Sequence, residues 1–290
     1  MIETRETHRS EGVLFVVGTP IGNREDITLR ALEILKNAHL VAAEDTRHTG
    51  RLLEHYGLRP RLVSYHKFNE RQRTPQLIGK LQEGHRIALV SSAGTPGVSD
   101  PGAILVRAAV AAGVRVSPIP GPSAAIAALS ISGLETEGFV FLGFPPRKKG
   151  RRGELLTALS RVPRALVWYE SPQRVLGFLE DLIDVMGDRN AMVCRELTKL
   201  HEEVLRGTLS EIHARLAQRE EIRGEVTVLI EGSDPGSAGT REAVREAIRS
   251  RLEADSAEDT NRIAKEISRQ YGWPKNSVYD EVLRLKGKKD

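Results

Sequence analysis

The sequence lacks the features of secreted and membrane proteins. It has a single cysteine, Cys194, which excludes an intramolecular disulfide framework and favours a reducing, cytoplasmic location. No uncharged apolar run approaches the ~20 residues that a membrane-spanning helix needs, so we expect no membrane partner. The polar residues 1–10 carry no signal-peptide core, and we expect this segment to be disordered.

Three common site motifs are also missing. The glycine loop at residues 18–23 lacks the G-x-G-x-x-G spacing of dinucleotide-binding proteins, and no segment matches the phosphate-binding G-x-x-x-x-G-K-[ST] loop. The run His201-Glu202-Glu203 differs from the zinc-binding H-E-x-x-H motif, and no other set of metal ligands stands out. We therefore expect neither a bound metal nor a nucleotide held through its phosphates.

Positive charge is concentrated in two segments, although the net charge is only +4. Residues 147–152 hold five cations and one glycine in six positions, and such cations repel one another without an anionic partner. This favours contacts with phosphate groups over an ordinary solvated surface. In the second segment, residues 45–75, Arg47 and His48 are interpreted as contacts to such a partner or as part of a helix start. The charge permits a nucleic acid as this partner, and its predicted binding residues are Arg47, His48, Arg147, Lys148, Lys149, Arg151 and Arg152.

The first half of the chain alternates apolar runs with helical patterns. The runs that predict strands are residues 13–17, 39–43, 61–64, 87–91 and 114–119. The helical patterns include residues 27–37, with Asp26 as the expected N-cap, 46–55 and 70–82. This repetition of strand, loop and helix is typical of a parallel sheet that is covered on both faces. We therefore predict an N-terminal α/β domain over residues 11–136.

In the second half, the expected strands follow one another more closely. Fewer helices separate the apolar runs, which favours a mixed sheet in a second α/β domain over residues 137–232. Residues 233–239 have the composition of a linker, and the helical patterns that follow predict a helical C-terminal domain over 240–290. Its last helix is expected to begin with Asn276 or Ser277 as the N-cap. This end resembles a helix-turn-helix, but its nearly balanced charge argues against it as the main anchor for a nucleic acid.

Three loops rich in glycine and proline follow strands of the predicted parallel sheet. They span residues 18–23, 91–102 and 118–125. Ligands of such sheets bind at the C-terminal ends of the strands, and glycine lets a backbone approach a ligand closely. Each loop alone is a weak signal, but three loops at one edge predict a binding site that is lined by backbone.

Seven segments together resemble, in order and spacing, the bacterial small-subunit ribosomal RNA cytidine 2′-O-methyltransferases of the tetrapyrrole-methylase superfamily. They are GTPIGN, AAEDTRHTGRLL, SSAGTPGVSDPG, PIPGPSAA, YESPQR, RELTKLHEE and GEVTVLIEG. The resemblance is close over residues 11–232 and loose in the tail. It implies S-adenosylmethionine-dependent 2′-O-methylation of a cytidine in small-subunit (16S) ribosomal RNA. It also implies a homodimer and a cofactor cleft between the two α/β domains.

The resemblance further implies which residues contact S-adenosylmethionine. In the first domain they are Pro20, Ser92, Ala93, Gly94, Val98, Ser123 and Ala124, and in the second Tyr169, Gly224, Glu225 and Thr227. One position departs from the relatives, which commonly carry Asp where this chain has Ser92. If the backbone makes the contact there, little is lost. If the carboxylate made it, either the affinity is weaker or Asp100 serves instead.

The chemistry itself suggests a catalytic group. A ribose hydroxyl is a poor nucleophile while it is protonated, so we expect a base, or a cation that stabilises the developing alkoxide. We predict Lys199 for this role, with Glu170 and Glu196 orienting it. An ordinary salt bridge between Glu196 and Lys199 is the alternative. Other candidates within the motifs are Glu44, Asp45, Arg195 and Glu225.

Two further functions fit the same sequence. One is a small-molecule methyltransferase that acts on a tetrapyrrole-like macrocycle, and the other is a non-catalytic RNA- or ribosome-binding factor. The basic segments and the helical tail favour RNA over a macrocycle. The three intact glycine loops favour an enzyme over a non-catalytic factor.

Overall fold

The computed structural model describes residues 11–134, 138–233, 241–254 and 258–287. The chain divides into two compact units, Met1–Ala127 and Ala128–Asp290, and each is described by itself. The segment expected to be disordered, 1–10, and the expected domain boundary at 136 and 137 lie outside the described residues. The expected cleft between the domains stays a prediction.

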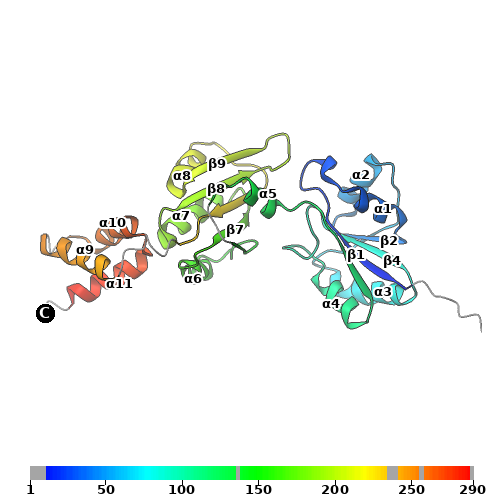
Figure 1. Cartoon of the computed structure of the whole chain (residues 1–290), viewed down its shortest axis with the longest axis horizontal. Coiled ribbons are helices and arrows are strands. Elements are labelled where there is room, and N and C mark those ends of the chain that lie inside the picture. Colours follow the sequence, from blue (N-terminus) through cyan, green and yellow to red (C-terminus); the bar gives the residue numbers. More distant parts are fainter. Residues whose placement is uncertain (1–10, 135–137, 234–240, 255–257, 288–290) are drawn as a thin grey trace, which may run out of the picture. The chain divides into compact units, whose positions relative to one another are not determined.

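The first unit is built on a five-stranded sheet of order β3-β2-β4-β1-β5. Figure 1 labels its three middle strands, β2, β4 and β1. Every neighbouring pair in this sheet is parallel, which confirms the predicted architecture. Its elements are β1 (Val13–Val17), α1 (Leu29–Asn37), β2 (Leu40–Ala43), α2 (Thr46–His55), β3 (Leu62–Ser64), α3 (Glu70–Gln82), β4 (Arg86–Val90), α4 (Ala103–Ala111) and β5 (Arg115–Ile119). Helix α5 (Ala124–Ser130) spans the boundary between the two units.

Two layers of helices cover the two faces of this sheet. Helices α1 and α2 pack on one face around Leu35, Val41 and Leu53, and α3 and α4 pack on the other around Leu81 and Leu105 (Figure 1). The neighbouring strands β1 and β4 therefore send their following helices to opposite faces. In open parallel sheets, ligands bind outside the C-terminal ends of such strands.

Two predicted helix caps are wrong. Asp26 does not cap α1, because it lies inside a 3₁₀ turn (Arg24–Asp26), and the N–H of Ala31 instead donates to Oγ1 of Thr28 at 3.1 Å. Neither Asn276 nor Ser277 caps the last helix, because that helix already begins at Lys275. Pro274 is its N-cap, with a φ of −56°, so the backbone of proline rather than a side-chain bond defines this start.

The second unit contains a five-stranded mixed sheet of order β6-β7-β10-β8-β9. Only β6 and β7 are parallel, and the other neighbours are antiparallel, as the sequence predicted. Trp168 is fully buried in its core and stacks edge-on against Phe178. The elements are β6 (Phe139–Phe141), α6 (Lys149–Leu159), β7 (Ala165–Glu170), α7 (Val175–Met186), β8 (Asn190–Arg195), β9 (Glu203–Thr208), α8 (Leu209–Ala217) and β10 (Val226–Ile230).

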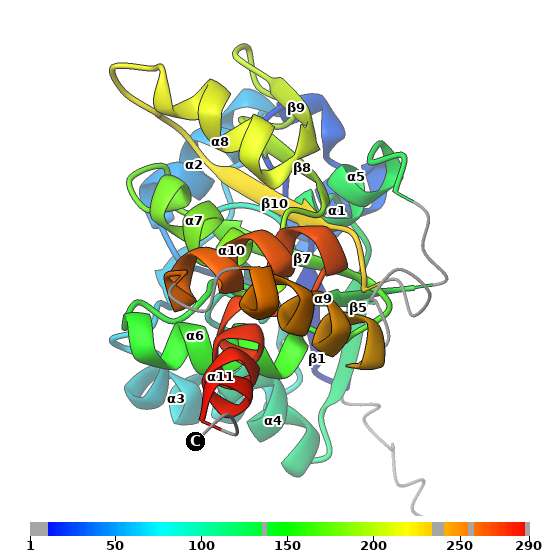
Figure 2. The same cartoon turned by 90° about the vertical axis from the view of Figure 1, so that its left-hand side faces the viewer.

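Three helices form the C-terminal part of this unit, shown in orange and red in Figure 2. They are α9 (Arg241–Ala254), α10 (Thr260–Tyr271) and α11 (Lys275–Lys286). Tyr271, Trp273 and Tyr279 pack against a small core of their own, around Ile248, Ile263 and Val278. Packing therefore accounts for these aromatic side chains. In the described part of the chain, no helix has the length and apolar character to cross a bilayer.

The loops after β1 and β5 touch through the backbones of two glycines. A Cβ on Gly18 would lie 2.8 Å from Cα of Gly121, and a Cβ on Gly121 would lie 2.9 Å from Cα of Gly18. Real Cβ atoms do not approach other heavy atoms so closely, and a backbone cannot swing aside as a side chain can. Both positions therefore require glycine.

We predict that Gly18→Ala lowers the free energy of unfolding by about 2 kcal/mol, because the added methyl group overpacks a backbone contact. The matched control is Gly79→Ala, since Gly79 lies inside α3 with open space around the missing Cβ. That substitution should raise the free energy of unfolding by about 0.5–1 kcal/mol through helix propensity. Urea denaturation of both variants measures the difference, and equal stabilities would contradict the contact.

Candidate functional site

The three glycine loops predicted from the sequence lie together at the C-terminal edge of the first sheet. The loops follow β1, β4 and β5, which are neighbours in the sheet. Thr19 and Gly94 form an isolated antiparallel bridge between two of them. The N–H of Thr19 donates to the carbonyl of Gly94 at 2.9 Å, and the N–H of Gly94 donates to the carbonyl of Thr19 at 3.0 Å. With the contact between Gly18 and Gly121, this bridge joins all three loops.

The loop after β4 has little side-chain bulk, and hydrogen bonds hold its backbone. The hydroxyl of Thr19 donates to the carbonyl of Ser91 at 3.2 Å, and the hydroxyl of Ser91 donates to the carbonyl of Ala93 at 3.1 Å. Gly94 has a φ of +72°, which a residue with a side chain rarely adopts. Val98 is 43% exposed farther along the loop. The loop thus presents backbone and small side chains in a fixed conformation.

A carboxylate reaches this loop from the neighbouring strand. Glu44 directly follows β2, and its Oε2 accepts hydrogen bonds from the N–H of Ser92 at 3.0 Å and from its hydroxyl at 2.9 Å. Within the described part of the chain, Oε1 of Glu44 has no hydrogen-bond partner. At the position where the resemblance implies an Asp, this chain therefore has Ser92 together with the carboxylate of Glu44. From the sequence alone, Glu44 is a candidate for the base and not for this contact.

The rest of the loop after β2 starts a helix. Oδ1 of Asp45 accepts from the N–H of His48 at 2.9 Å and from that of Arg47 at 2.8 Å. These backbone hydrogen bonds hold the pKa of Asp45 below its ordinary value, so this carboxylate is a helix cap rather than a proton acceptor. The side chains of Arg47 and His48 are exposed at the same edge of the sheet. They remain available to a ligand, although their backbone forms the helix start.

A second cluster of polar groups lies in the other unit, where Glu196, Lys199 and Glu225 interlock. Nζ of Lys199 lies 2.8 Å from Oε1 of Glu196 and 3.1 Å from Oε2 of Glu225. The N–H of Glu225 donates to the same Oε1 of Glu196 at 2.9 Å. Glu196 and Thr198 have positive φ values of 53° and 64°, in the left-handed region that non-glycine residues seldom occupy. Such strain is frequent in functional loops.

Gly224 makes room for this cluster. Its φ is +89°, and a Cβ there would collide with Cγ and Oε1 of Glu196. Glycine is therefore required at 224 by the space that Glu196 occupies, and the contact of Gly224 with the cofactor stays a prediction. The structure also brings Glu196 and Lys199 together as the sequence predicted.

The electrostatics of the cluster keep Lys199 charged. Partial burial opposes the charge of Lys199, but the hydrogen bonds to Glu196 and Glu225 outweigh it and raise its pKa. Burial also opposes the charge of Glu196, but the hydrogen bonds from Lys199 and from the backbone of Glu225 lower its pKa. Lys199 is therefore an ammonium ion at neutral pH and cannot accept a proton. Of its two predicted roles, stabilising negative charge is the one that fits.

Glu170 is not joined to this cluster. It is buried at the end of β7 and forms an ion pair with Arg174, while the N–H of Ser171 donates to it at 2.6 Å. Among the described residues, these contacts do not include Lys199. The contacts that hold the ammonium of Lys199 therefore come from Glu196 and Glu225 rather than from Glu170.

The remaining predicted cofactor residues of this unit lie on paired strands. Tyr169 of β7 is in register with Thr227 of β10, and its ring packs edge-on against Phe141 and Phe144. Thr227 is buried and is also in register with Cys194 of β8. Burial raises the pKa of the Cys194 thiol to about 12, so this cysteine is not a nucleophile. Within the described ranges, His, Cys, Asp and Glu side chains form no cluster suited to a metal ion.

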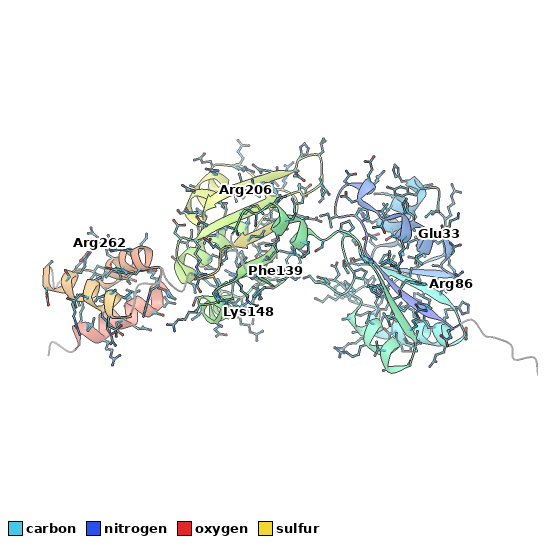
Figure 3. All side chains as sticks on the ribbon, viewed as in Figure 1. Glu33, Arg86, Phe139, Lys148, Arg206 and Arg262 are labelled. Atoms are coloured by element: carbon cyan, nitrogen blue, oxygen red, sulfur yellow. The ribbon has the colours of Figure 1, made fainter. Side chains whose placement is uncertain are left out.

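Of the five cations in the basic segment 147–152, one has a structural role and four are exposed. Nε of Arg152 donates to Asp181 at 2.6 Å, and its guanidinium also reaches the carbonyls of Pro146 and Arg147. Its side chain is only 14% exposed, so this ion pair holds the start of α6 against α7. The other predicted cations are exposed, and Lys148 is labelled in Figure 3. They are Arg147, Lys148, Lys149 and Arg151.

Known proteins are similar to this chain in sequence. A family described as Tetrapyrrole (Corrin/Porphyrin) Methylases matches residues 13–213. A protein named Ribosomal RNA small subunit methyltransferase I from Micromonospora olivasterospora is 47% identical, over 93% of this chain and 86% of that protein. A protein of the same name from Escherichia coli O157:H7 is 42% identical, over 99% of this chain and 100% of that protein.

Solved structures show the same fold. The crystal structure of uroporphyrin-III-C-methyltransferase from Thermus thermophilus has a TM-score of 0.55 and 23% identity, and covers 75% of this chain and 94% of that one. The methyltransferase CobJ has a TM-score of 0.57 and 20% identity, and covers 76% of this chain and 94% of that one. At these identities the likeness concerns the fold alone.

A network of arginines supports the strained loop that carries Lys199. Glu203, at the start of β9, accepts from Nε of Arg195 at 3.0 Å and from Nη1 of Arg219 at 2.7 Å. Arg195 also donates to the carbonyl of Arg223 at 3.2 Å. The hydrogen bonds from Arg219, and then those from Arg195, lower the pKa of Glu203 to about 2 despite partial burial. Both ends of the loop are thus anchored.

A carboxylate with a depressed pKa contributes stability that is present above its ordinary pKa and is lost as the pH falls through the depressed one. We therefore predict that Glu203→Gln lowers the free energy of unfolding at pH 7 by about 2 kcal/mol. The difference from the unsubstituted chain should shrink between pH 4.5 and about 2. Urea denaturation across this range measures it.

The matched control for that series is Glu220→Gln, which removes the same charge from an exposed position. It should change the free energy of unfolding by less than about 0.5 kcal/mol at every pH. A Glu203→Gln effect that persists unchanged at pH 2 would contradict the ionic origin of the stability.

Proposed function

This chain belongs to the tetrapyrrole (corrin/porphyrin) methylase family, and we propose on that premise that it is an S-adenosylmethionine-dependent methyltransferase of small-subunit ribosomal RNA. Its reaction is 2′-O-methylation of a cytidine ribose. The observation that carries the proposal is the joining of three backbone-lined loops at one edge of the parallel sheet. Two relatives of nearly the same extent are named Ribosomal RNA small subunit methyltransferase I, which supports the substrate class and the methyl transfer.

The residues of the first unit fit S-adenosylmethionine. When bound, this molecule supplies a methyl group on a positively charged sulfur, a good leaving group that needs alignment more than activation. The loop after β4 offers Ser92, Ala93 and Gly94 with their backbone groups, and bulky side chains would obstruct that approach. The neighbouring loops would add Pro20, Ser123 and Ala124 to this binding surface, and Val98 would cover it.

Glu44 supplies the carboxylate of this site. Ser92 holds one of its oxygens with two hydrogen bonds, so the other oxygen has a defined position beside the loop. A carboxylate oxygen accepts hydrogen bonds from hydroxyl and ammonium groups, and S-adenosylmethionine carries both. We assign Glu44 the contact to one of these groups. This makes Asp100 unnecessary for that contact.

In the second unit, Lys199 stabilises the charge that develops on the ribose oxygen. The oxygen would gain the methyl group, the sulfonium would become a neutral thioether, and the hydroxyl proton would pass to solvent water. An ammonium ion nearby lowers the energy of the negative charge that develops on the oxygen. Glu196 and Glu225 hold the ammonium in place rather than take part themselves. Tyr169, Gly224 and Thr227 shape the surroundings of this cluster.

The decisive experiment uses purified protein, S-adenosylmethionine with a labelled methyl group, and small ribosomal subunits from cells that lack this chain. We expect label in the RNA, recovered after digestion as 2′-O-methylcytidine. Label on a base, or methylation of a porphyrinogen in place of RNA, would contradict the proposal. No transfer to any acceptor, with RNA binding retained, would favour the non-catalytic factor.

The same assay tests Lys199. We predict that Lys199→Met lowers kcat about 10²–10³-fold, the usual cost of removing one group that stabilises an oxyanion. Binding of S-adenosylmethionine should stay within two-fold of the unsubstituted chain. The matched control is Lys36→Met in the last turn of α1, which is exposed and should leave kcat unchanged. If Lys199→Met only lowers stability, Lys199 is an ordinary salt-bridge residue.

The exposed cations of the basic segment would hold the RNA backbone. Replacing Arg147, Lys148, Lys149 and Arg151 with Gln should reduce the slope of log affinity against log salt concentration by about 3, because each phosphate contact releases counterions. Arg152 is kept because it anchors α6 to Asp181. Filter binding of ribosomal RNA at several salt concentrations measures the slope.

The control for the basic segment removes four other exposed cations of the same chain. They are Arg30, Lys36, Arg86 and Arg115. The last two lie at the starts of their strands, at the edge opposite to the glycine loops. An equal loss of slope in both quadruple variants would mean that general charge, rather than this segment, attracts the RNA.

Two further features belong to the proposal. The single cysteine supports a cytoplasmic location, where ribosomal RNA is found. The resemblance supports a homodimer. Both remain predictions.

A further inference from the structure

An aromatic side chain stands exposed at the same edge of the first sheet. Phe68 is 93% exposed, although phenylalanine is normally among the more buried residues. It lies in the short loop between β3 and α3, in the sequence Tyr65-His66-Lys67-Phe68-Asn69. Neither the predicted cofactor residues nor the predicted RNA contacts include it.

The loop holds Phe68 in place rather than leaving it loose. The N–H of His66 donates to Oδ1 of Asn69 at 2.8 Å, and Nδ2 of Asn69 donates to the hydroxyl of Ser64 at 3.2 Å. The N–H of Phe68 donates to Nδ1 of His66 at 3.3 Å, and the N–H of Asn69 donates to the carbonyl of His66 at 2.9 Å. The His66 ring packs edge-on against the Phe68 ring, with 6.0 Å between centroids. These contacts fix the conformation of the loop, so the Phe68 ring is held in an exposed position.

The loop is adjacent to groups already assigned to the site. The N–H of Tyr65 donates to the carbonyl of Ala43 at 2.8 Å, immediately before Glu44. Because β3 and β2 are parallel, the loop emerges at the same edge as Arg47 and His48. Along this edge the sheet order places β2 between β3 and β4. The glycine loops therefore lie along the same edge of the first sheet as Phe68, with Arg47 and His48 between them.

The surroundings of Phe68 are charged rather than apolar. Lys67 precedes it and Arg71 follows in the first turn of α3, and both are exposed. The other exposed large apolar side chains described in this unit, such as Leu29 and Val110, lie on other elements. A single aromatic ring among cations is poorly suited to a protein interface, which buries an apolar patch. It is well suited to single-stranded RNA, whose bases stack on aromatic rings while cations neutralise the backbone.

We propose that Phe68 is a stacking platform for an unpaired nucleobase of the RNA substrate, flanked by Lys67, Arg71, Arg47 and His48 as phosphate contacts. The inference rests on the proposed function and adds a substrate-binding residue to it. Because stacking on an aromatic ring works with any base, the platform would hold the strand beside the methylated nucleotide without reading its sequence.

The kinetic test compares Phe68→Ala, Phe68→Leu and Phe68→Trp in the methylation assay with small ribosomal subunits. We expect the Ala and Leu variants to raise KM for the subunits about ten-fold, and the Trp variant to keep it, because only Trp retains a π-face. The value of kcat and the affinity for S-adenosylmethionine should stay within two-fold. The matched control is Leu29→Ala, which removes another side chain that is 86% exposed and should leave KM unchanged.

A binding test separates failure of the inference from failure of the proposed function. The fluorescence of Phe68→Trp should be quenched by a single-stranded ribosomal RNA fragment, with the unsubstituted chain as the blank for Trp168 and Trp273. This readout needs no catalysis, so it stands even if the chain methylates something else. Unchanged KM in Phe68→Ala together with no quenching would overturn the inference. So would a Leu variant that behaves as the unsubstituted chain, or a change in sedimentation of Phe68→Ala, since these indicate a protein contact.

Discussion

The bridge between Thr19 and Gly94 joins the loops that follow the neighbouring strands β1 and β4, at the place where their connections leave for opposite faces of the sheet. The backbone contact of Gly18 with Gly121 adds the loop after β5. Hydrogen bonds within the chain thereby satisfy much of the loop backbone, and the side chains stay small. A ligand with a reactive centre can approach such a wall closely, and Glu44 adds one charge at its side.

The candidate site of the second unit is built from side chains rather than from backbone. Its functional groups are long charged side chains, and their positions depend on one another through shared oxygens. A glycine at 224 and left-handed residues at 196 and 198 allow this arrangement, while the ion pairs of Glu203 hold the strands around it. The raised pKa of Lys199 follows from this environment and defines its chemistry as that of a cation. Preorganised charge is the usual means of stabilising an oxyanion.

Much of the fold and part of the candidate site were predictable from the sequence, because burial periodicity and glycine-rich turns are local signals. The helices α2 and α3 have the predicted ends, and the three loops meet as expected. Contacts between distant segments were not predictable. The pairing of Glu44 with Ser92 joins two strands far apart in the sequence, and that of Arg152 with Asp181 joins two helices. A run of basic residues does not reveal which of them has a structural role. The exposure of Phe68 could not be predicted either, because it depends on the fold around the loop.

The carboxylate of Glu44 beside the glycine loop is the central group of the proposed cofactor site. Calorimetric titration with S-adenosylmethionine tests its contribution to binding. The unsubstituted chain should bind one equivalent, and Glu44→Gln should bind about ten-fold more weakly, because it loses a hydrogen bond to a charged group. Glu54→Gln, on the exposed side of α2, is the matched control and should bind as the unsubstituted chain does. No binding by the unsubstituted chain, or equal binding by Glu44→Gln, would contradict the account.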